Sequence, residues 1–339
     1  MNATPTATET ATATHTATAT VAPTVVTSVG FTFSAVGDLG ASENTTATLK
    51  AMGAAGTDFM LVVGDLSYGD LDPVSAWCEY VSRLTGGQPV QLLVGNHEDQ
   101  HSRHIDQFAE CLPDRLNSTG FYAHRYYFDY PADAPTARFV LIDPDVERSL
   151  RGEPTGIDMQ YCSLYGDPNA ENCDWTKAAI RDAKAAGLWV IVGSHKNCTT
   201  MGTKGCEIGT GLQDMLLGEG VDLIVQGHEH LYERSKPLAL DDGCTGIVPN
   251  EFNVGCIAEP GETGTTIVIS GAGGKSLRNI ELWHPDRGYF ANYMAANTDD
   301  AGYGFSRFAV DDCTISGEFI AAVGGHEDSF VIDRCGGGE

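Results

Sequence analysis

Several short apolar runs in this chain end in a glycine followed by a polar, metal-type side chain. Residues 59–63 lead into Gly64-Asp65, and residues 90–94 lead into Gly95-Asn96. Continuous apolar runs of this length predict buried strands, and glycine lets the backbone turn sharply where a strand ends. In open α/β sheets, ligands collect at the carboxyl ends of strands. We therefore expect these motifs to meet at one edge of the fold.

Hydrophobic periodicity predicts how strands and helices alternate along the chain. Strands are expected over residues 31–36, 59–63, 90–94, 126–130, 138–142, 188–192, 222–225, 266–270, 305–310, 314–321 and 330–332. Helices are expected over residues 42–55, 73–84, 175–186 and 212–217. Residues 145–172 and 241–263 lack a clear period and are expected to be loops. This order of elements predicts an α/β sandwich with mixed sheets.

Low complexity separates the first residues from the rest of the chain. Residues 1–24 are nearly all Ala and Thr with a few Pro, a composition that cannot pack a core. We expect a disordered tail or linker there, and a single catalytic domain over residues 25–339. The remaining length is sufficient for one large core.

The formal charge of −26 excludes several classes of partner. So acidic a chain is poorly suited to bind nucleic acid through its phosphates or to lie on an anionic membrane. No stretch is long and apolar enough to predict a membrane span. A phosphorylated substrate would be repelled at long range, so local positive charge must overcome the global field.

Cysteine usage indicates an oxidising compartment. The ten cysteines fall into neighbouring pairs, although sequence alone does not prove their connectivity. The expected pairs are Cys78 with Cys111, Cys162 with Cys173, Cys198 with Cys206, Cys244 with Cys256, and Cys313 with Cys335. Because disulfides persist outside the cytosol, we expect a secreted or extracellular protein. No signal peptide is visible after Met1, and we expect that one has been removed from this chain.

Four Asn-x-Ser/Thr sequons fit the same compartment. They begin at Asn2, Asn44, Asn117 and Asn197. In a eukaryotic secretory host they would be glycosylation sites, although such sequons also occur by chance.

Seven side chains in the glycine-bounded motifs are suited to hard or borderline metal ions. They are Asp38, Asp65, Tyr68, Asn96, His195, His228 and His230. A bridging carboxylate with such a set can hold two cations, which orient a phosphoryl group and stabilise attacking and leaving oxygens. Taken alone, Asp65 would be interpreted as a turn or helix-cap residue, but within the set a bridging role is preferred.

The motifs resemble those of purple acid phosphatases, a branch of the calcineurin-like metallophosphoesterases. The resemblance is carried, in order, by Gly37-Asp38-Leu-Gly40, Gly64-Asp65-Leu-Ser-Tyr68, Gly95-Asn96-His97-Glu98, Val192-Gly-Ser-His195 and Gly227-His228-Glu-His230. It extends from about Phe31 to the C-terminus and includes Gly271-Ala-Gly-Gly274. The corresponding fold class is α/β: a four-layer αββα sandwich with two mixed β-sheets and the metal site at the carboxyl ends of the strands.

The replacement of a histidine by a tyrosine indicates the purple acid phosphatase branch. Most metallophosphoesterases have Asp-x-His in the first motif, whereas this chain has Asp38-Leu39-Gly40 and gains Tyr68 after Asp65. A phenolate is a hard anionic ligand that favours a trivalent ion. The resemblance implies Fe(III) bound by Asp38, Tyr68 and His230.

The rest of the ligand set follows from the same resemblance. Asp65 would bridge, and a divalent Fe, Zn or Mn ion would bind Asn96, His195 and His228. A metal-bound hydroxide would attack phosphorus in line, without a covalent enzyme intermediate.

The resemblance is weaker for the residues that contact the substrate. It places His97 beside the metals, where it would bind phosphate or protonate the leaving oxygen. Many relatives carry further histidines about ten residues after the fourth motif, where this chain has Lys204 and Gly205. Lys196, Asn197 and Lys204 are therefore candidate substrate contacts, although a solvated role is the ordinary one for each. Glu98 and Arg234 are expected to tie loops together rather than catalyse.

Three functional interpretations follow, and all three use the same motifs. The first is a secreted phosphomonoesterase that acts on small phosphorylated substrates at a dinuclear Fe(III)–M(II) site. The second is a phosphodiesterase acting on nucleotides or lipid head groups with the same core. The third is a catalytically silent surface-binding protein, against which the complete ligand set argues.

Overall fold

The computed structural model describes residues 30–99, 104–112, 114–144, 170–259 and 261–336, together with Met1 and Cys162. Apart from Met1, the expected tail of residues 1–24 lies outside these residues, so its disorder stays a prediction. The domain boundary expected at residue 25 also lies outside them. Most of the loop expected over residues 145–172 does so too.

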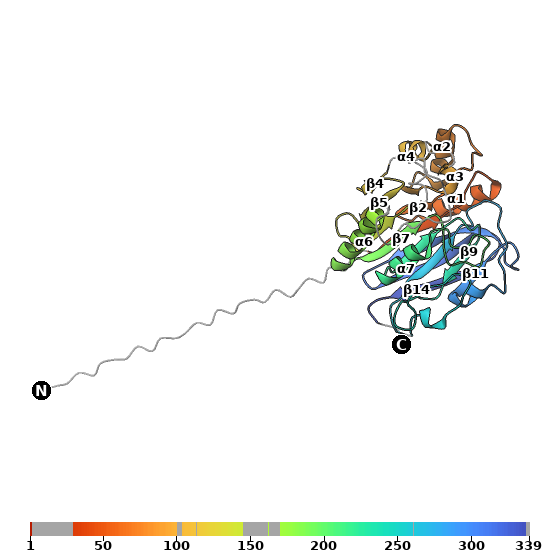
Figure 1. Ribbon diagram of the computed structural model, residues 1–339. Helices are drawn as coiled ribbons and strands as arrows, with labels where there is room; N and C mark the ends of the chain where they lie inside the picture. Colours follow the sequence, from red (N-terminus) through yellow and green to blue (C-terminus); the bar gives the residue numbers. More distant parts are fainter. Residues whose placement is uncertain are drawn as a thin grey trace.

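Two mixed β-sheets form the centre of the described chain (Figure 1). One sheet has the order β14-β13-β12-β1-β2-β3, and the other has the order β11-β9-β10-β8-β7-β6-β5-β4. The strands are β1 Phe31–Val36, β2 Phe59–Val63, β3 Val90–Leu93, β4 Thr119–Phe121, β5 Arg125–Tyr130, β6 Ala137–Leu141, β7 Trp189–Ser194, β8 Leu223–Gln226, β9 Tyr232–Ser235, β10 Thr266–Ser270, β11 Phe290–Met294, β12 Tyr303–Val310, β13 Thr314–Val323 and β14 Asp328–Asp333. In the first sheet β1, β2 and β3 are parallel. In the second sheet β6, β7, β8 and β10 are parallel.

Helices cover the outer faces of both sheets. The helices are α1 Glu43–Ala55, α2 Val74–Thr85, α3 Asn96–Asp99, α4 His104–Cys111, α6 Ala170–Ala185 and α7 Thr210–Gly218, with 3-10 turns η1 Val254–Cys256 and η2 Pro285–Tyr289. α1 packs on β12 and β13, and α2 packs on α1 and α4, whereas α6 packs on β6 and β7. Figure 1 shows α2 and α4 together, apart from α6 and α7. The predicted sandwich of helices and two mixed sheets is confirmed.

The interior between the sheets is aromatic. Phe33 and Phe59 of the first sheet meet Phe139 of the second, with ring centroids 4.9 and 5.2 Å apart in edge-to-face arrangements. All three side chains are fully buried. Burying each ring contributes about 1.5–3 kcal/mol, and favourable ring pairs add about 0.5–1.5 kcal/mol. This packing fixes the two sheets against each other and thereby fixes the strand ends.

The first helix begins where its sequence predicts. Ser42 caps α1, accepting a hydrogen bond from the Thr45 amide, while the Thr45 hydroxyl accepts from the Ser42 amide. Such caps contribute about 1 kcal/mol each. The Ser42 hydroxyl also donates to the carbonyl of Gly274, 2.9 Å away, so the cap holds the distant glycine-rich segment in place.

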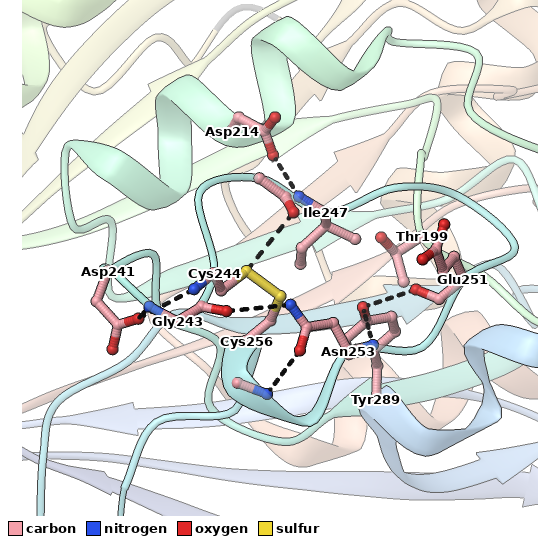
Figure 2. Close-up of a disulfide and its surroundings, with 12 residues drawn as sticks. Thr199, Asp214, Asp241, Gly243, Cys244, Ile247, Glu251, Asn253, Cys256 and Tyr289 are labelled. Carbon is pink, nitrogen blue, oxygen red and sulfur yellow. Dashed lines mark hydrogen bonds between the residues drawn. A yellow bond between two sulfur atoms is a disulfide. The ribbon is translucent and has the colours of Figure 1, made fainter.

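All five expected disulfides are present among the described residues. Figure 2 shows the Cys244–Cys256 bridge in the expected loop of residues 241–263. There the Asn253 side chain donates to the carbonyl of Gly243 and accepts from the amide of Gly255. The bridge and these hydrogen bonds order a segment that has little regular structure.

Some elements differ from the sequence-based expectation. Helix α6 begins at Ala170, five residues before the predicted start at residue 175, because its polar first turn carries no apolar period. Strands β4, β9 and β11 and helix α4 were not expected. β4 is exposed at every position and β11 packs at a sheet edge, so neither has the apolar run of a buried strand.

Candidate metal centre

The carboxyl ends of five strands bring the predicted ligands to one edge of the molecule. Asp38 follows β1, Asp65 follows β2, and Asn96 follows β3 in the first sheet. In the second sheet, His195 follows β7 and His228 follows β8. The Gly37 amide donates to the carbonyl of Ser270 at 2.8 Å, so the two sheets are tied together at this edge.

Two groups of side chains could each hold a metal ion, and they share one residue. Asp38, Asp65 and His230 form the first group, and Asp65, His195 and His228 form the second. Within each group the candidate ligand atoms all lie within 4.8 Å of one another. A shared carboxylate between two groups is the arrangement that a bridged pair of cations requires.

Tyr68 completes the first group. Its hydroxyl donates to Asp38 Oδ1 and Asp65 Oδ2, both 2.9 Å away, and lies 3.1 Å from His230 Nε2. The exchange of histidine for tyrosine seen in the motifs therefore has a geometric counterpart, because Tyr68 lies among the ligands of the first group.

Asn96 completes the second group. Its Oδ1 and Asp65 Oδ1 each lie 3.2 Å from His195 Nε2. His195 Nδ1 faces the carbonyl of Val63 at 2.8 Å, and His230 Nδ1 faces the carbonyl of Ser276 at 2.9 Å. A backbone partner on Nδ1 fixes the imidazole ring and leaves Nε2 to face a metal. All seven predicted ligands are thus brought together.

Comparison with known proteins agrees with this geometry. The model of the calcineurin-like phosphoesterase family matches residues 31–232, which contain all seven side chains. This chain belongs to the calcineurin-like phosphoesterase family. The resemblance to its purple acid phosphatase branch is also confirmed by curated relatives.

Among those relatives is a purple acid phosphatase of Glycine max, 27% identical over 61% of this chain and 44% of its own length. Another is the Fe(3+)-Zn(2+) purple acid phosphatase 12 of Arabidopsis thaliana, 26% identical over 73% of this chain and 51% of its own length. The chain therefore spans about half the length of the curated relatives that it matches.

Solved structures share the fold. The purple acid phosphatase PPD1 from yellow lupin seeds aligns with a TM-score of 0.60 at 18% identity, covering 91% of this chain and 54% of its own. GAP50, described as the anchor in the inner membrane complex of Plasmodium, aligns with a TM-score of 0.59 at 13% identity. The alignment covers 90% of this chain and 89% of GAP50. One fold thus carries a phosphatase and an anchor, so function must be argued from the site.

The backbone at the centre is held in an uncommon conformation. Asp38, Asp65, Tyr68 and His228 have positive φ angles of 58°, 52°, 52° and 67°. Such conformations cost on the order of 1–3 kcal/mol each in non-glycine residues and cluster at functional sites. The neighbouring Gly95 is also required, because a Cβ there would collide with the Asp65 amide nitrogen and carboxylate.

Electrostatics reflect charges buried at close range. Burial alone would raise the pKa of Asp65, but His195 and then His97 outweigh it and hold this pKa well below its usual range. Burial lowers the pKa of His195, yet Asp65 and Asp38 more than compensate and raise it to about 9. Burial, followed by the charges of Asp38 and Asp65, raises the pKa of Tyr68 far above its usual value. The protein alone keeps this phenol protonated, and a bound cation is what would stabilise the phenolate.

Glu98 ties loops together, as predicted. Its carboxylate accepts hydrogen bonds from the backbone amides of Asp65, Leu66 and Gly95 at 2.9–3.0 Å. Burial and then the charge of Asp65 raise its pKa to about 8. His97 precedes it and has a different environment: its side chain is 38% exposed, with Nε2 3.8 Å from Asp65 Oδ2. His97 is thus the motif histidine that solvent reaches.

The three candidate substrate contacts differ. Lys196 and Lys204 lie near the centre, with Nζ atoms 3.0 and 3.9 Å from the carboxylate of Glu207. Asn197 is fully buried, and neither of its side-chain polar atoms has a hydrogen bond within the described chain. Its burial also removes it from the accessible sequons.

Two residues at the centre were missed from the sequence. Glu207 lies 3.2 Å from His228 Nε2. Burial would raise its pKa, but His228 and Lys196 lower it to about 2. Lys275 Nζ lies 4.0 Å from the centre of the Tyr68 ring. Lys275 directly follows the glycine-rich motif Gly271–Gly274, so its position in the sequence could have indicated a place at the centre. Glu207 belongs to no motif, and nothing in its spacing indicated that it lies there.

Proposed function

We propose that this chain is a secreted, metal-dependent phosphomonoesterase of the purple acid phosphatase type, acting at a dinuclear Fe(III)–M(II) centre. The observation that carries the proposal is the pair of ligand groups sharing Asp65, with Tyr68 in the first group. Family membership supports phosphoric ester hydrolysis, and the tyrosine supports the trivalent ion.

Each side chain then has a role in holding the ions. Asp38, Tyr68 and His230 would hold Fe(III). Asn96, His195 and His228 would hold a divalent Fe, Zn or Mn ion, and Asp65 would be shared between the two ions. The donor set fits, because it consists of buried carboxylates, one phenol oxygen, one amide oxygen and three imidazoles, of which those of His195 and His230 are fixed by backbone carbonyls. When bound, two such cations would polarise the phosphoryl group and lower the pKa of a water molecule.

The remaining side chains act on the substrate. His97 exchanges a proton with the leaving oxygen, a role supported by its partial exposure beside Asp65. The ammonium groups of Lys196, Lys204 and Lys275 supply local positive charge around the centre. This local field draws in an anionic phosphate against the charge of −26 carried by the whole chain.

The most informative experiment combines elemental analysis with a visible spectrum of the oxidised protein. We expect iron and a second metal in equal amounts, together with an iron–phenolate absorption band. Tyr68→Phe should remove the band. A Tyr68→Phe protein that keeps its iron and stays equally coloured would exclude Tyr68 as the source.

Substrate assays separate the other interpretations. Turnover of an aryl phosphate should exceed that of a bis-aryl phosphate, and the reverse ratio would favour a phosphodiesterase. A folded protein that takes up no iron would favour the surface-binding interpretation.

Location and domain organisation belong to the same proposal. The disulfides fit an extracellular protein, and residues 1–24 are proposed as a linker before a catalytic domain over residues 25–339. Asn117 is exposed in a turn and is the sequon best placed for a glycan. No helix among the described residues has the length and apolar character needed to cross a membrane.

A further inference from the structure

The ammonium group of Lys275 lies over the face of the Tyr68 ring. Its Nζ is 4.0 Å from the ring centre. A cation within about 6 Å of an aromatic centroid is attracted by the negative face of the ring. The charge of Lys275 therefore acts directly on one of the seven candidate ligands.

The two ends of the Tyr68 side chain have different neighbours. Its hydroxyl lies 2.9 Å from Asp38 Oδ1 and from Asp65 Oδ2, and 3.1 Å from His230 Nε2. A metal ion held by these atoms would bind at the oxygen end of the side chain. Lys275 instead lies over the ring, so its charge is placed on the electrons of the ring and not among the ligand atoms.

The backbone of Lys275 is fixed between two residues of the first ligand group. Its amide donates a hydrogen bond to the carbonyl of Asp38 at 3.0 Å. The next residue, Ser276, places its carbonyl 2.9 Å from His230 Nδ1. The side chain of Lys275 thus begins at a point that the centre itself holds in place.

The residue before Lys275 is fixed as well. Gly274 accepts a hydrogen bond from the Ser42 hydroxyl at 2.9 Å. A Cβ at Gly274 would collide with Thr45, so only glycine allows the chain to pass this close to the start of α1. The segment on both sides of Lys275 is therefore set by the surrounding structure.

Lys275 differs from the other lysines at the centre in its partners. Lys196 and Lys204 have Nζ atoms 3.0 and 3.9 Å from the carboxylate of Glu207. Among the residues that the structure describes, the Lys275 ammonium makes no ion pair or hydrogen bond, and the Tyr68 ring is its neighbour. No carboxylate contact compensates the charge that Lys275 places over the ring.

A cation in this position changes how strongly a phenolate donates electrons. By Coulomb's law, a positive charge lowers the energy of electrons close to it more than of electrons farther away. An iron–phenolate absorption band arises when light moves an electron from the phenolate ring to Fe(III). A cation over the ring therefore makes this transfer more costly, and the band moves to shorter wavelength.

We propose that Lys275 acts on the iron site through Tyr68, as a positioning residue whose ammonium group weakens the electron donation of the phenolate to Fe(III). This inference rests on the proposed function, because it assumes an iron–phenolate bond. A weaker donor leaves the ferric ion a stronger Lewis acid, which is the property that polarises a phosphoryl group. It also makes the ferric ion easier to reduce.

The test measures the absorption band rather than turnover. Visible spectra of the oxidised parent and of Lys275→Met are compared at equal iron content. Methionine has a similar length and no charge, so the band should move to longer wavelength by on the order of 10–20 nm. Lys275→Arg keeps a cation suited to an aromatic face and should return the band to within about 5 nm of the parent.

Reduction gives an independent measure of the same effect. A titration with reductant in the presence of redox mediators follows the loss of the band. Lys275→Met should require a stronger reductant than the parent does, because removing a nearby positive charge disfavours the added electron. A residue that only supports the fold would move neither the band nor the reduction.

A matched control separates the ring contact from charge in general. Lys204→Met also removes a positive charge near the centre, but one that faces Glu207 instead of the Tyr68 ring. It should move the band less than about half as far as Lys275→Met does. Lys275 is only partly buried, so its variants should fold, and circular dichroism checks this.

The possible outcomes are distinct. An unshifted band in Lys275→Met, an equal shift in Lys204→Met, or loss of the iron from Lys275→Met overturns this role and leaves the proposed function intact. A parent protein without an iron–phenolate band overturns both. A shift to longer wavelength in Lys275→Met that Lys275→Arg reverses establishes the role of Lys275.

Discussion

Phe33 and Phe59 are fully buried between the sheets. Asp38 and Asp65, just past the ends of the same two strands, are almost equally buried, at 0 and 1% exposure. The aromatic rings need no further partner, since each packs against rings of the facing sheet. The two carboxylates do need one, because both are buried next to the same tyrosine hydroxyl and both belong to residues with positive φ angles.

The difference shows how the fold can hold a site whose buried charges and backbone conformations are themselves unfavourable. Burying charge is costly unless a partner compensates, and uncommon backbone conformations add on the order of 1–3 kcal/mol each. The apolar interior provides the stability that offsets these costs and also positions the strand ends. We therefore expect changes in the interior to alter stability, and changes at the metal centre to alter metal binding and activity.

The largest expected effect is on activity at the shared carboxylate. Asp65→Ala should lower turnover by roughly 10³-fold or more, because losing a bridge between two cations removes several kcal/mol of transition-state stabilisation. Steady-state kinetics and metal content measure this. The protein should stay soluble, since the interior is untouched, and turnover equal to the parent's would refute a bridging role.

A substitution in the aromatic interior should lower stability and leave turnover unchanged. Phe139→Ala should reduce the free energy of unfolding by about 3–5 kcal/mol through lost burial and a cavity between the sheets. Urea unfolding measures this, and turnover per folded molecule at low temperature should be unchanged. If Phe139→Ala lost turnover while keeping its stability, the two regions would not be separable.

Removing the metals should destabilise the chain less than losing the aromatic packing does. A ligand that binds only the folded state adds about 2.7–4.1 kcal/mol at 100 to 1,000 times its Kd. Chelation should therefore lower the thermal midpoint, and it should do so less in Asp65→Ala than in the parent. Scanning calorimetry with and without chelator tests this, and equal shifts in both proteins would contradict it.

The last expected effect is a pH dependence of stability close to the metal centre. Burial raises the pKa of Glu233 from 4.5 to about 8. The folded state then binds the proton more tightly than the unfolded state, so this contribution is complete below pH 4.5 and is lost as pH rises through 8. Glu233→Gln should flatten the decline in stability over this window.

Unfolding midpoints in urea at about pH 5 and about pH 8 measure the difference. Glu219→Gln serves as the control, since its carboxylate is not in the interior. A decline with pH that is as steep in Glu233→Gln as in the parent would assign the pH dependence to other groups.

Much of this arrangement could be predicted from local patterns. The apolar runs located β1, β2 and β10 to the residue, and the neighbouring cysteines gave all five disulfides. The seven ligand candidates were found because each follows a strand in a short motif. Edge strands such as β4 and β11 were missed because their exposed or half-buried residues lack a continuous apolar run.

By itself, the sequence determined the order of elements and the residue types at each strand end, because apolar period and glycine turns act over a few residues. Only the tertiary structure decided that Lys275 lies against the Tyr68 ring, and that Glu207, next to a disulfide-closed loop, reaches His228. Such contacts depend on how two sheets pack and where a loop returns. Those are long-range consequences of burying the shared interior, and no local pattern encodes them.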